Sequence, residues 1–341
     1  MRKIAFFAAV AATLCTVACN KNMEIAGQTG NDGKAGNEDL VEINLAISGA
    51  QNVATKTAAA DFDDTHCEVD NVQFFVFNDN DELDAYKKIT DGIQTTLSVR
   101  KGHVKIWAIV NADDITDVSN RAELEACTST LSDNVDKFIM TGHDTFSIPD
   151  DFEEGVPTIV VNRLAARVVV KNITAVFTNP SLAESSCKLV RMYLVNAPGN
   201  TNFAHNTTPS LWYCKQAYEN VDGLNDFLFT SGGNQELNTA PFTTPCYHYC
   251  YPNPTTDDTS NATWSPRHTR MVVEVLLGSE TFYYPITLPK LQAGYSYEID
   301  NLTITRKGSS NPDEPVVLES GEFQISVRPW TVVPVTSGIT I

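Results

Sequence analysis

The cysteines and histidines are the residues of this sequence that could hold a metal. Cys246 and Cys250 stand four residues apart in the segment Cys-Tyr-His-Tyr-Cys. A structural zinc site needs four ligands at a recognisable spacing, and no second pair of cysteines or histidines lies nearby. The six histidines are scattered along the chain. We therefore predict no metal site, and a disulfide or free thiols are the favoured states of the two cysteines.

Catalytic motifs are absent from the sequence. It contains no HExxH, no GxSxG and no GxGxxG after a strand. Among 42 acidic residues, carboxylate pairs that resemble a glycosidase dyad arise by chance. The four tryptophans, Trp107, Trp212, Trp264 and Trp330, are too far apart in the chain to predict a stacking platform, so core packing or loop anchoring is favoured. We predict a protein that is not an enzyme and uses no cofactor.

The first residues are typical of an export signal. Arg2 and Lys3 precede an apolar stretch over 4–17 that is too short to span a membrane comfortably. The stretch leads into Thr-Val-Ala-Cys, which resembles a lipobox and ends at Cys19. In a lipobox the cysteine thiol is acylated and becomes the first residue of the mature protein. We expect a lipoprotein signal peptide over 1–18, with an ordinary signal peptide as the alternative.

Composition and charge narrow the class of partner. Hydrophobic residues make up 42% of the 341 residues, which is typical of a globular chain long enough for two domains. The formal net charge is −18, and it becomes −20 when the signal peptide leaves with the two positive charges of Arg2 and Lys3. Such a charge opposes binding to nucleic acid or to anionic lipid surfaces.

A polar tether precedes the first predicted strand. Residues 20–38 have glycines at every third position among polar neighbours and cannot bury enough apolar surface to fold. Immediately afterwards, apolar residues alternate with more polar ones, which predicts a strand with one buried face. The apolar positions of this first strand are Val41, Ile43, Leu45 and Ile47.

The remaining pattern predicts an all-β protein. Further strands are expected at 71–77, 104–110, 156–173, 188–195, 270–277, 281–287, 295–305 and 322–335. Helical periodicity is scarce, and 121–139 is the best candidate for a short helix. Residues 196–265 are rich in Asn, Thr, Pro and aromatic residues, so we expect long connections there. Strands separated by Asn, Asp, Gly and Pro turns favour two β-sandwiches with a boundary near 150–165.

The C-terminal residues 323–341 form an apolar, strand-like tail with no charge after Arg328. Such a tail needs a groove to cover it. It could add an edge strand to its own sheet, or it could complete the sheet of a neighbouring molecule by β-strand addition.

Several segments, in the same order along the chain, resemble the major fimbrial subunits (fimbrillins) of type V pili, which anaerobic Gram-negative bacteria make. The segments are the lipobox with Cys19-Asn20-Lys21, the first strand followed by Lys56-Thr57-Ala58-Ala59, 72–78, 108–112, 163–168, 297–304 with 311–315, and 327–330.

This resemblance implies a fold and a mechanism. The fold is two tandem β-sandwich domains of the transthyretin-like, Greek-key type after the signal peptide. The precursor is exported, lipidated at Cys19 and carried to the outer membrane, where a trypsin-like protease removes the first strand. The C-terminal strand of another subunit then fills the groove and a filament grows. The residues of the implied donor strand are Phe323, Ile325, Val327, Trp330, Val332, Val333, Val335, Ile339 and Ile341.

The cleavage site departs from the family pattern, because its best-known members are cut after arginine. No arginine lies between Arg2 and Arg100, so the implied cut falls between Lys56 and Thr57, with Lys34 as a weaker candidate. Either a protease that accepts lysine acts here, or the subunit is not processed in this way.

The expected organisation and partners follow from these features. We predict a propeptide over 19–56, an N-terminal β-sandwich over 57–157 and a C-terminal β-sandwich over 158–341. The expected role is a structural subunit of an adhesive surface fimbria, whose partners are other copies, accessory fimbrial subunits and a host or bacterial receptor. A tip or anchor subunit, or a monomeric surface lipoprotein that binds glycan or host protein, is the alternative.

Overall fold

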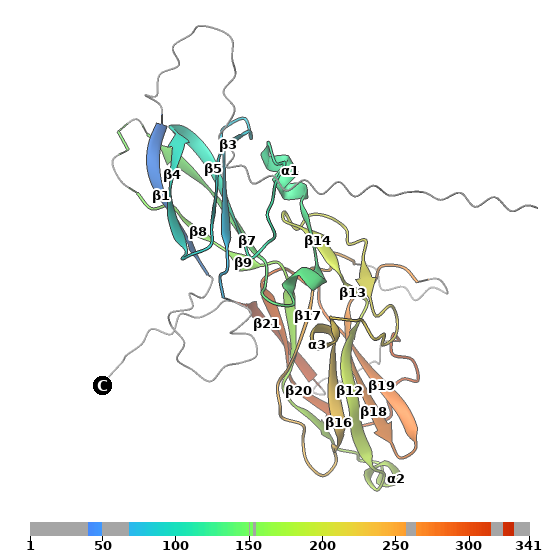
Figure 1. The fold of residues 1–341 in the computed structure, drawn as a ribbon. Coiled ribbons are helices and arrows are strands. Elements are labelled where there is room, and N and C mark those ends of the chain that lie inside the picture. The colour runs from blue at the N-terminus through green and yellow to red at the C-terminus, as the bar shows by residue number, and fades with distance from the viewer. Residues whose placement is uncertain are drawn as a thin grey trace, which may run out of the picture. The chain divides into compact units, whose positions relative to one another are not determined.

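The computed structural model describes residues 40–49, 68–149, 151–152, 155–256, 264–314 and 323–330. Most of these residues lie in β-strands (Figure 1), which confirms the predicted all-β fold class. None of the helices in these ranges is long and apolar enough to cross a membrane.

The N-terminal part of the described chain contains two sheets with one core between them. The larger sheet has the order β3-β2-β5-β7-β9 and the smaller has the order β4-β1-β8. The core takes side chains from both sheets, including Phe74, Ile106 and Ile159. The strands of this part are β1 (Leu40–Ser48), β2 (Val72–Phe77), β3 (Leu83–Ile89), β4 (Gln94–Arg100), β5 (Gly102–Val110), β7 (Met140–Ile148), β8 (Thr158–Val160) and β9 (Asn162–Arg163).

Strands β2 and β5 are buried on both faces, which explains their nearly continuous apolar sequences. Phe74 and Ile106 point into the core between the two N-terminal sheets. Phe75 and Trp107, one position further along each strand, belong to the second core cluster instead. This second cluster is the one that fills the C-terminal part of the molecule.

The C-terminal part repeats the arrangement with two larger sheets. In one sheet β20 is paired with β10, β11 and β21, and β10 is also paired with β17; the other has the order β16-β12-β18-β19. Their strands are β10 (Ala166–Val170), β11 (Ile173–Ala175), β12 (Cys187–Val195), β16 (Phe229–Glu236), β17 (Cys246–Cys250), β18 (Arg270–Leu277), β19 (Glu280–Thr287), β20 (Tyr295–Ile304) and β21 (Phe323–Pro329). Tyr297 and Ile299 of one sheet and Val273 of the other lie in the shared core.

Two short strand pairs and a few short helical turns complete the fold. Strand β14 pairs with β6, which joins the C-terminal part to the N-terminal part, and β13 pairs with β15. The remaining elements are α1 (Arg121–Ala126), β6 (Thr128–Thr130), η4 (Leu131–Asn134), α2 (Pro180–Ala183), β13 (Ala197–Pro198), β14 (Asn200–Asn202), β15 (Trp212–Tyr213) and α3 (Asn225–Leu228).

The helix expected over 121–139 is wrong for most of its length. Helix α1 ends at Ala126, and Cys127 is already extended with φ −56° and ψ 134°. The next residues form β6, whose Ser129 hydroxyl lies 2.6 Å from the hydroxyl of Tyr251. Tertiary pairing with β14 therefore overrides the local helical pattern.

Two further expectations also need correction. The single strand expected over 156–173 is four short strands, β8 to β11, which belong to three different sheets. The connection expected over 196–265 contains five strands, β13 to β17, of which β16 and β17 belong to the two larger C-terminal sheets. Contacts join Asp39–Ile341 into one compact unit, so the predicted division between 157 and 158 remains a prediction.

The five described cysteines are free thiols. Cys246 and Cys250 mark the two ends of strand β17, so their Cα atoms are about 13 Å apart. A disulfide needs a Cα separation of roughly 4.4–6.8 Å, which excludes a bond between these two residues. Burial raises the pKa of the Cys187, Cys214 and Cys246 thiols to about 11.

These thiols should react slowly in the native protein. We expect N-ethylmaleimide at pH 8 to modify Cys127 first, because it is the only half-buried thiol among the five described ones and the others are buried. Peptide mapping by mass spectrometry after timed quenching measures the order. In denaturant without reductant all five should be alkylated, and a pair that resists alkylation there would contradict the free-thiol assignment.

Candidate strand-exchange site

Strand β1 lies in the middle of the smaller N-terminal sheet, between two strands from later in the chain. It pairs with β4 in antiparallel fashion from Leu40 to Ala46. It pairs with β8 in parallel fashion from Ala46 to Ser48. Among the described residues this sheet has three strands, so without β1 the strands β4 and β8 would have no partner between them.

Alternate side chains of β1 fill the core between the N-terminal sheets. Ile43, Leu45 and Ile47 are 1%, 0% and 2% exposed, and the half-buried Val41 packs against the same core. Burial of one aliphatic side chain contributes roughly 1.5–3 kcal/mol. Three such side chains are thus worth about 5–9 kcal/mol, a contribution comparable with the roughly 5–15 kcal/mol stability of a whole domain.

The end of β1 fits tightly under the chain that follows β8. The backbone N–H of Val161 donates to the carbonyl oxygen of Ser48 at 2.9 Å. Gly49 has φ +88°, and a Cβ atom on it would lie 2.5 Å from the carbonyl oxygen of Val161. Glycine is required here for both its conformation and its lack of a side chain.

Strand β21, the last described strand, lies at the edge of its sheet. It runs antiparallel to β20, from Pro329 opposite Tyr295 to Phe323 opposite Leu302. No other described strand pairs with it. Ile325 packs against the C-terminal core, Val327 is 50% exposed, and Trp330 just beyond the strand is buried.

A cluster of ion pairs fastens the outer face of β21 to its neighbours. The carboxylate of Glu298 in β20 lies 2.6 Å from the Lys171 ammonium and 2.5 Å from the Arg328 guanidinium of β21. Burial by itself would raise the pKa of Glu298, but the hydrogen bonds from Lys171 and Arg328 outweigh it and leave this pKa lowered. The carboxylate therefore stays charged and links the edge strand to the sheet.

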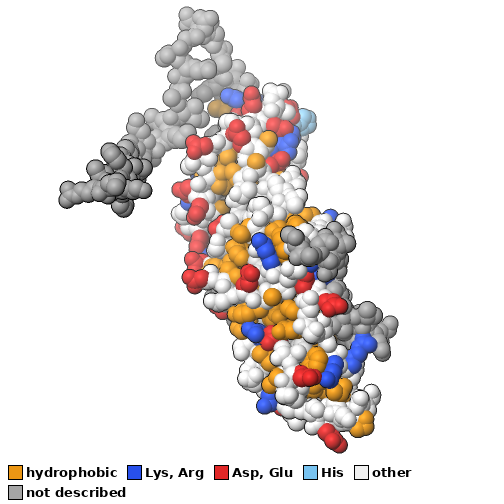
Figure 2. Space-filling model, turned by 90° about the vertical axis from the view of Figure 1, so that its right-hand side faces the viewer, with side chains coloured by type: hydrophobic (Ala, Val, Ile, Leu, Met, Phe, Trp, Pro, Cys, Tyr) orange, Lys and Arg blue, Asp and Glu red, His pale blue; other side chains and the backbone are white. Residues whose placement is uncertain are grey.

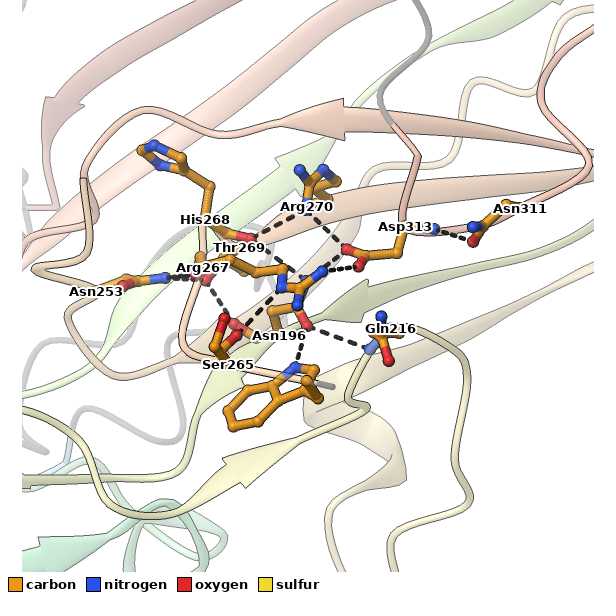
Figure 3. Close-up of polar contacts among 11 residues, drawn as sticks. Asn196, Gln216, Asn253, Ser265, Arg267, His268, Thr269, Arg270, Asn311 and Asp313 are labelled. Atoms are coloured by element: carbon orange, nitrogen blue, oxygen red, sulfur yellow. Dashed lines mark hydrogen bonds and ion pairs between the residues drawn. The ribbon is translucent and has the colours of Figure 1, made fainter. Parts of the chain in front are cut away.

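A buried ion cluster holds the connection between β20 and β21 (Figure 3). Asp313 accepts hydrogen bonds from Arg267 at 2.7 Å and Arg270 at 2.8 Å. Both arginine side chains are 1% exposed and the aspartate is 4% exposed. Asn196, which also accepts from the Trp264 indole, donates to the same carboxylate at 2.8 Å. One carboxylate thus compensates two buried cations.

Several predicted site residues lie outside the described residues. These are the lipidation residue Cys19, the cleavage pair Lys56 and Thr57, and the donor residues Val332, Val333, Val335, Ile339 and Ile341. The structure brings the four predicted residues of the first strand together on one face of β1. It places Phe323, Ile325 and Val327 in β21 and Trp330 directly after it.

Acidic side chains gather along one edge of the face seen in Figure 2. Within the described ranges, no group of three or more His, Cys, Asp or Glu side chains is arranged to hold a metal ion. Sequence reasoning missed the cluster of Arg267, Arg270 and Asp313. The available signal was two arginines, Arg267 and Arg270, just before and at the start of a largely apolar strand, since charges there are buried only when they are paired.

Comparison with known proteins identifies the fold. No family model matches the sequence, and no curated protein matches it either. Among solved structures, fimbrilin FimA from Porphyromonas gingivalis W83 superimposes with a TM-score of 0.57 at 16% identity, over 86% of this chain and 98% of that one. The chain has the fimbrillin fold.

A second fimbrial protein shares this fimbrillin fold. The tip fimbrial protein Mfa3 from Porphyromonas gingivalis, with a C-terminal truncation, matches with a TM-score of 0.50 at 12% identity, over 86% of this chain and 99% of that one. The predicted resemblance to fimbrillins is therefore confirmed at the level of the fold.

The ion cluster of Asp313 should contribute measurably to the stability of the fold. We expect Asp313→Asn to lower the free energy of unfolding by roughly 3–5 kcal/mol, because it leaves two buried arginines without a carboxylate. Urea unfolding followed by fluorescence measures the loss. Glu314→Gln is the matched control, since the neighbouring Glu314 is exposed and should change stability by no more than about 0.5 kcal/mol. Equal midpoints for the two variants would contradict the assignment.

Proposed function

We propose that this protein is a structural subunit of a bacterial surface fimbria that polymerises by strand exchange and supports adhesion. The observation that carries the proposal is the central place of β1 in the three-stranded sheet. A strand from the start of the chain fills a core that is otherwise built from later residues. Removal of that strand would leave a groove of the right length and chemistry for another strand.

Cleavage between β1 and β2 supplies a trigger for the exchange. While the chain is intact, β1 is tethered beside its groove at an effective concentration in the millimolar range. A cut after Lys56 would turn β1 into a separate peptide that is lost by dilution. The emptied groove would then be open to a strand from another subunit.

The sequence of the C-terminal tail suits this groove. Every second residue from 333 to 341 is apolar except Ser337, and in a strand these residues would lie on one face. The apolar residues are Val333, Val335, Ile339 and Ile341. The apolar residues of β1 follow the same alternation. A donor strand with this pattern could fill the pockets that Ile43, Leu45 and Ile47 vacate.

The export signal and the lipobox support a place at the cell surface. We propose that the precursor is lipidated at Cys19, reaches the outer membrane and enters the extracellular fimbria after cleavage. The apolar tail favours a shaft subunit over a tip or anchor subunit, because a shaft subunit must both donate and accept a strand. The binding partners in this proposal are other copies of the chain and accessory fimbrial subunits.

Deletion of residues 331–341 should abolish incorporation into fimbriae and leave the subunit folded, because it keeps the pairing of β21 with β20 and the buried Trp330. Immunoblots of sheared surface material, run without boiling, measure the high-mass ladder, and circular dichroism checks the fold. A normal ladder from the truncated subunit would refute the donor role.

Replacement of Lys56 tests the trigger separately. We expect Lys56→Gln to leave a full-length, acylated chain without polymers, whereas Lys34→Gln, which alters a basic residue of the tether before the first strand, should be processed normally. Mass spectrometry and N-terminal sequencing identify the mature ends. A mature chain that still begins at Thr57 in the Lys56 variant would argue against a protease that recognises this lysine.

A further inference from the structure

Trp330 directly follows β21 and is buried, whereas the strand itself lies at the surface. The indole is 5% exposed, while Val327 is 50% exposed and the Arg328 side chain is 61% exposed. An edge strand that is open along one side ends in one of the most buried tryptophans of the molecule. Trp330 therefore adds a buried attachment to the pairing with β20 and to the ion pair of Arg328 with Glu298.

Aromatic and cationic groups from distant parts of the chain surround the indole. Phe138 meets the ring edge-on at 5.0 Å, and Tyr249 stacks on it at 5.6 Å. The guanidinium of Arg163 lies 4.3 Å from the ring centroid and that of Arg167 lies 5.0 Å from it. Edge-on and stacked aromatic contacts and guanidinium groups over the ring each stabilise a buried indole beyond the burial of its apolar surface.

The backbone of Trp330 is fixed as well as its side chain. Its N–H donates to the carbonyl oxygen of Gly294 at 2.7 Å. Its carbonyl oxygen accepts from the Nη1 atom of Arg163 at 2.8 Å. Arg163 belongs to β9, a strand of the larger N-terminal sheet. Trp330 is thereby tied to both the N-terminal and the C-terminal parts of its own subunit.

The position of Trp330 decides which contacts break first when a force pulls on the residues that follow it. A force on the residues after Trp330 would act first on the C-terminal end of β21 and would otherwise peel the edge strand away one pair at a time. The indole must first leave its contacts with Phe138, Tyr249, Arg163 and Arg167, and only then can the strand pairing break.

We propose that Trp330, held by Arg163, is the positioning anchor of the donor strand. It keeps β21 in its own sheet and fixes the point from which the donor residues reach the next subunit. The inference rests on the proposed strand exchange. It adds that the load between subunits enters the core of the donor at this residue.

The test compares two tryptophans of equal burial in the full-length protein. Trp330→Leu removes the anchor. Trp212→Leu is the matched control, because Trp212 is also 5% exposed and packs against Trp264, which is not among the rings that contact Trp330. Both variants should lower the melting temperature of the purified subunit. We expect only Trp330→Leu to give fimbriae whose ladders dissociate faster on heating in detergent, by about an order of magnitude or more. Trp330→Phe, which keeps an aromatic ring, should bring the dissociation rate part of the way back to that of the unmodified protein.

Arg163→Lys provides a second variant if Trp330→Leu does not fold. It keeps the charge and loses the planar stacking and the forked hydrogen bonding, so it should also speed dissociation. Deletion of 331–341 distinguishes a failure of the Trp330 anchor from a failure of strand exchange. If that deletion abolishes polymers while Trp330→Leu and Arg163→Lys dissociate at the rate of Trp212→Leu, the anchor is overturned and strand exchange stands. If the deletion leaves polymers intact, strand exchange itself fails and the anchor fails with it.

Discussion

The core between the two N-terminal sheets is closed by a strand from the beginning of the chain. Ile43, Leu45 and Ile47 of β1 fill this core, and the strands on either side of β1 come from later segments. The contribution of these three side chains approaches the net stability of an ordinary domain. This core is therefore complete only with β1 in place, and in the proposed mechanism a strand from another chain would have to supply the same burial.

The larger N-terminal sheet has support on its other face. Phe75 and Trp107 point away from β1 and into the core cluster that continues through the C-terminal part. Strands β2 and β5 would thus keep half of their packing if β1 left. In the proposed mechanism this two-sided burial lets the subunit open a groove without losing the sheet that forms its floor, because a packed core resists gradual deformation.

The sequence predicted those elements whose pattern follows from local burial. The alternation of β1 and the continuous apolar runs of β2 and β5 gave strands close to those of the structure. The segment over 121–139 failed because β6 is stabilised by pairing with β14, more than 70 positions later. The role of Trp330 was equally hidden. In the sequence, Trp330 cannot be told apart from the other apolar residues of the tail. Only its contacts with Phe138, Arg163 and Tyr249 in the folded chain distinguish it.

The direction of the proposed exchange follows from what each strand is attached to. A cleaved β1 would be held to its groove by its own pairing and by Ile43, Leu45 and Ile47, so dilution removes it. A donor tail of similar pattern would gain a comparable burial, and it would be joined through Trp330 to a whole folded subunit. Because the tail is covalently part of that subunit, it would escape only by leaving the groove, whether or not the indole stays in place. In the proposed mechanism a released β1 peptide is diluted, whereas a tail that leaves the groove stays joined to a whole subunit and can rebind while that subunit remains nearby. The proposed exchange would therefore favour the filament even when the two strands fit the groove equally well.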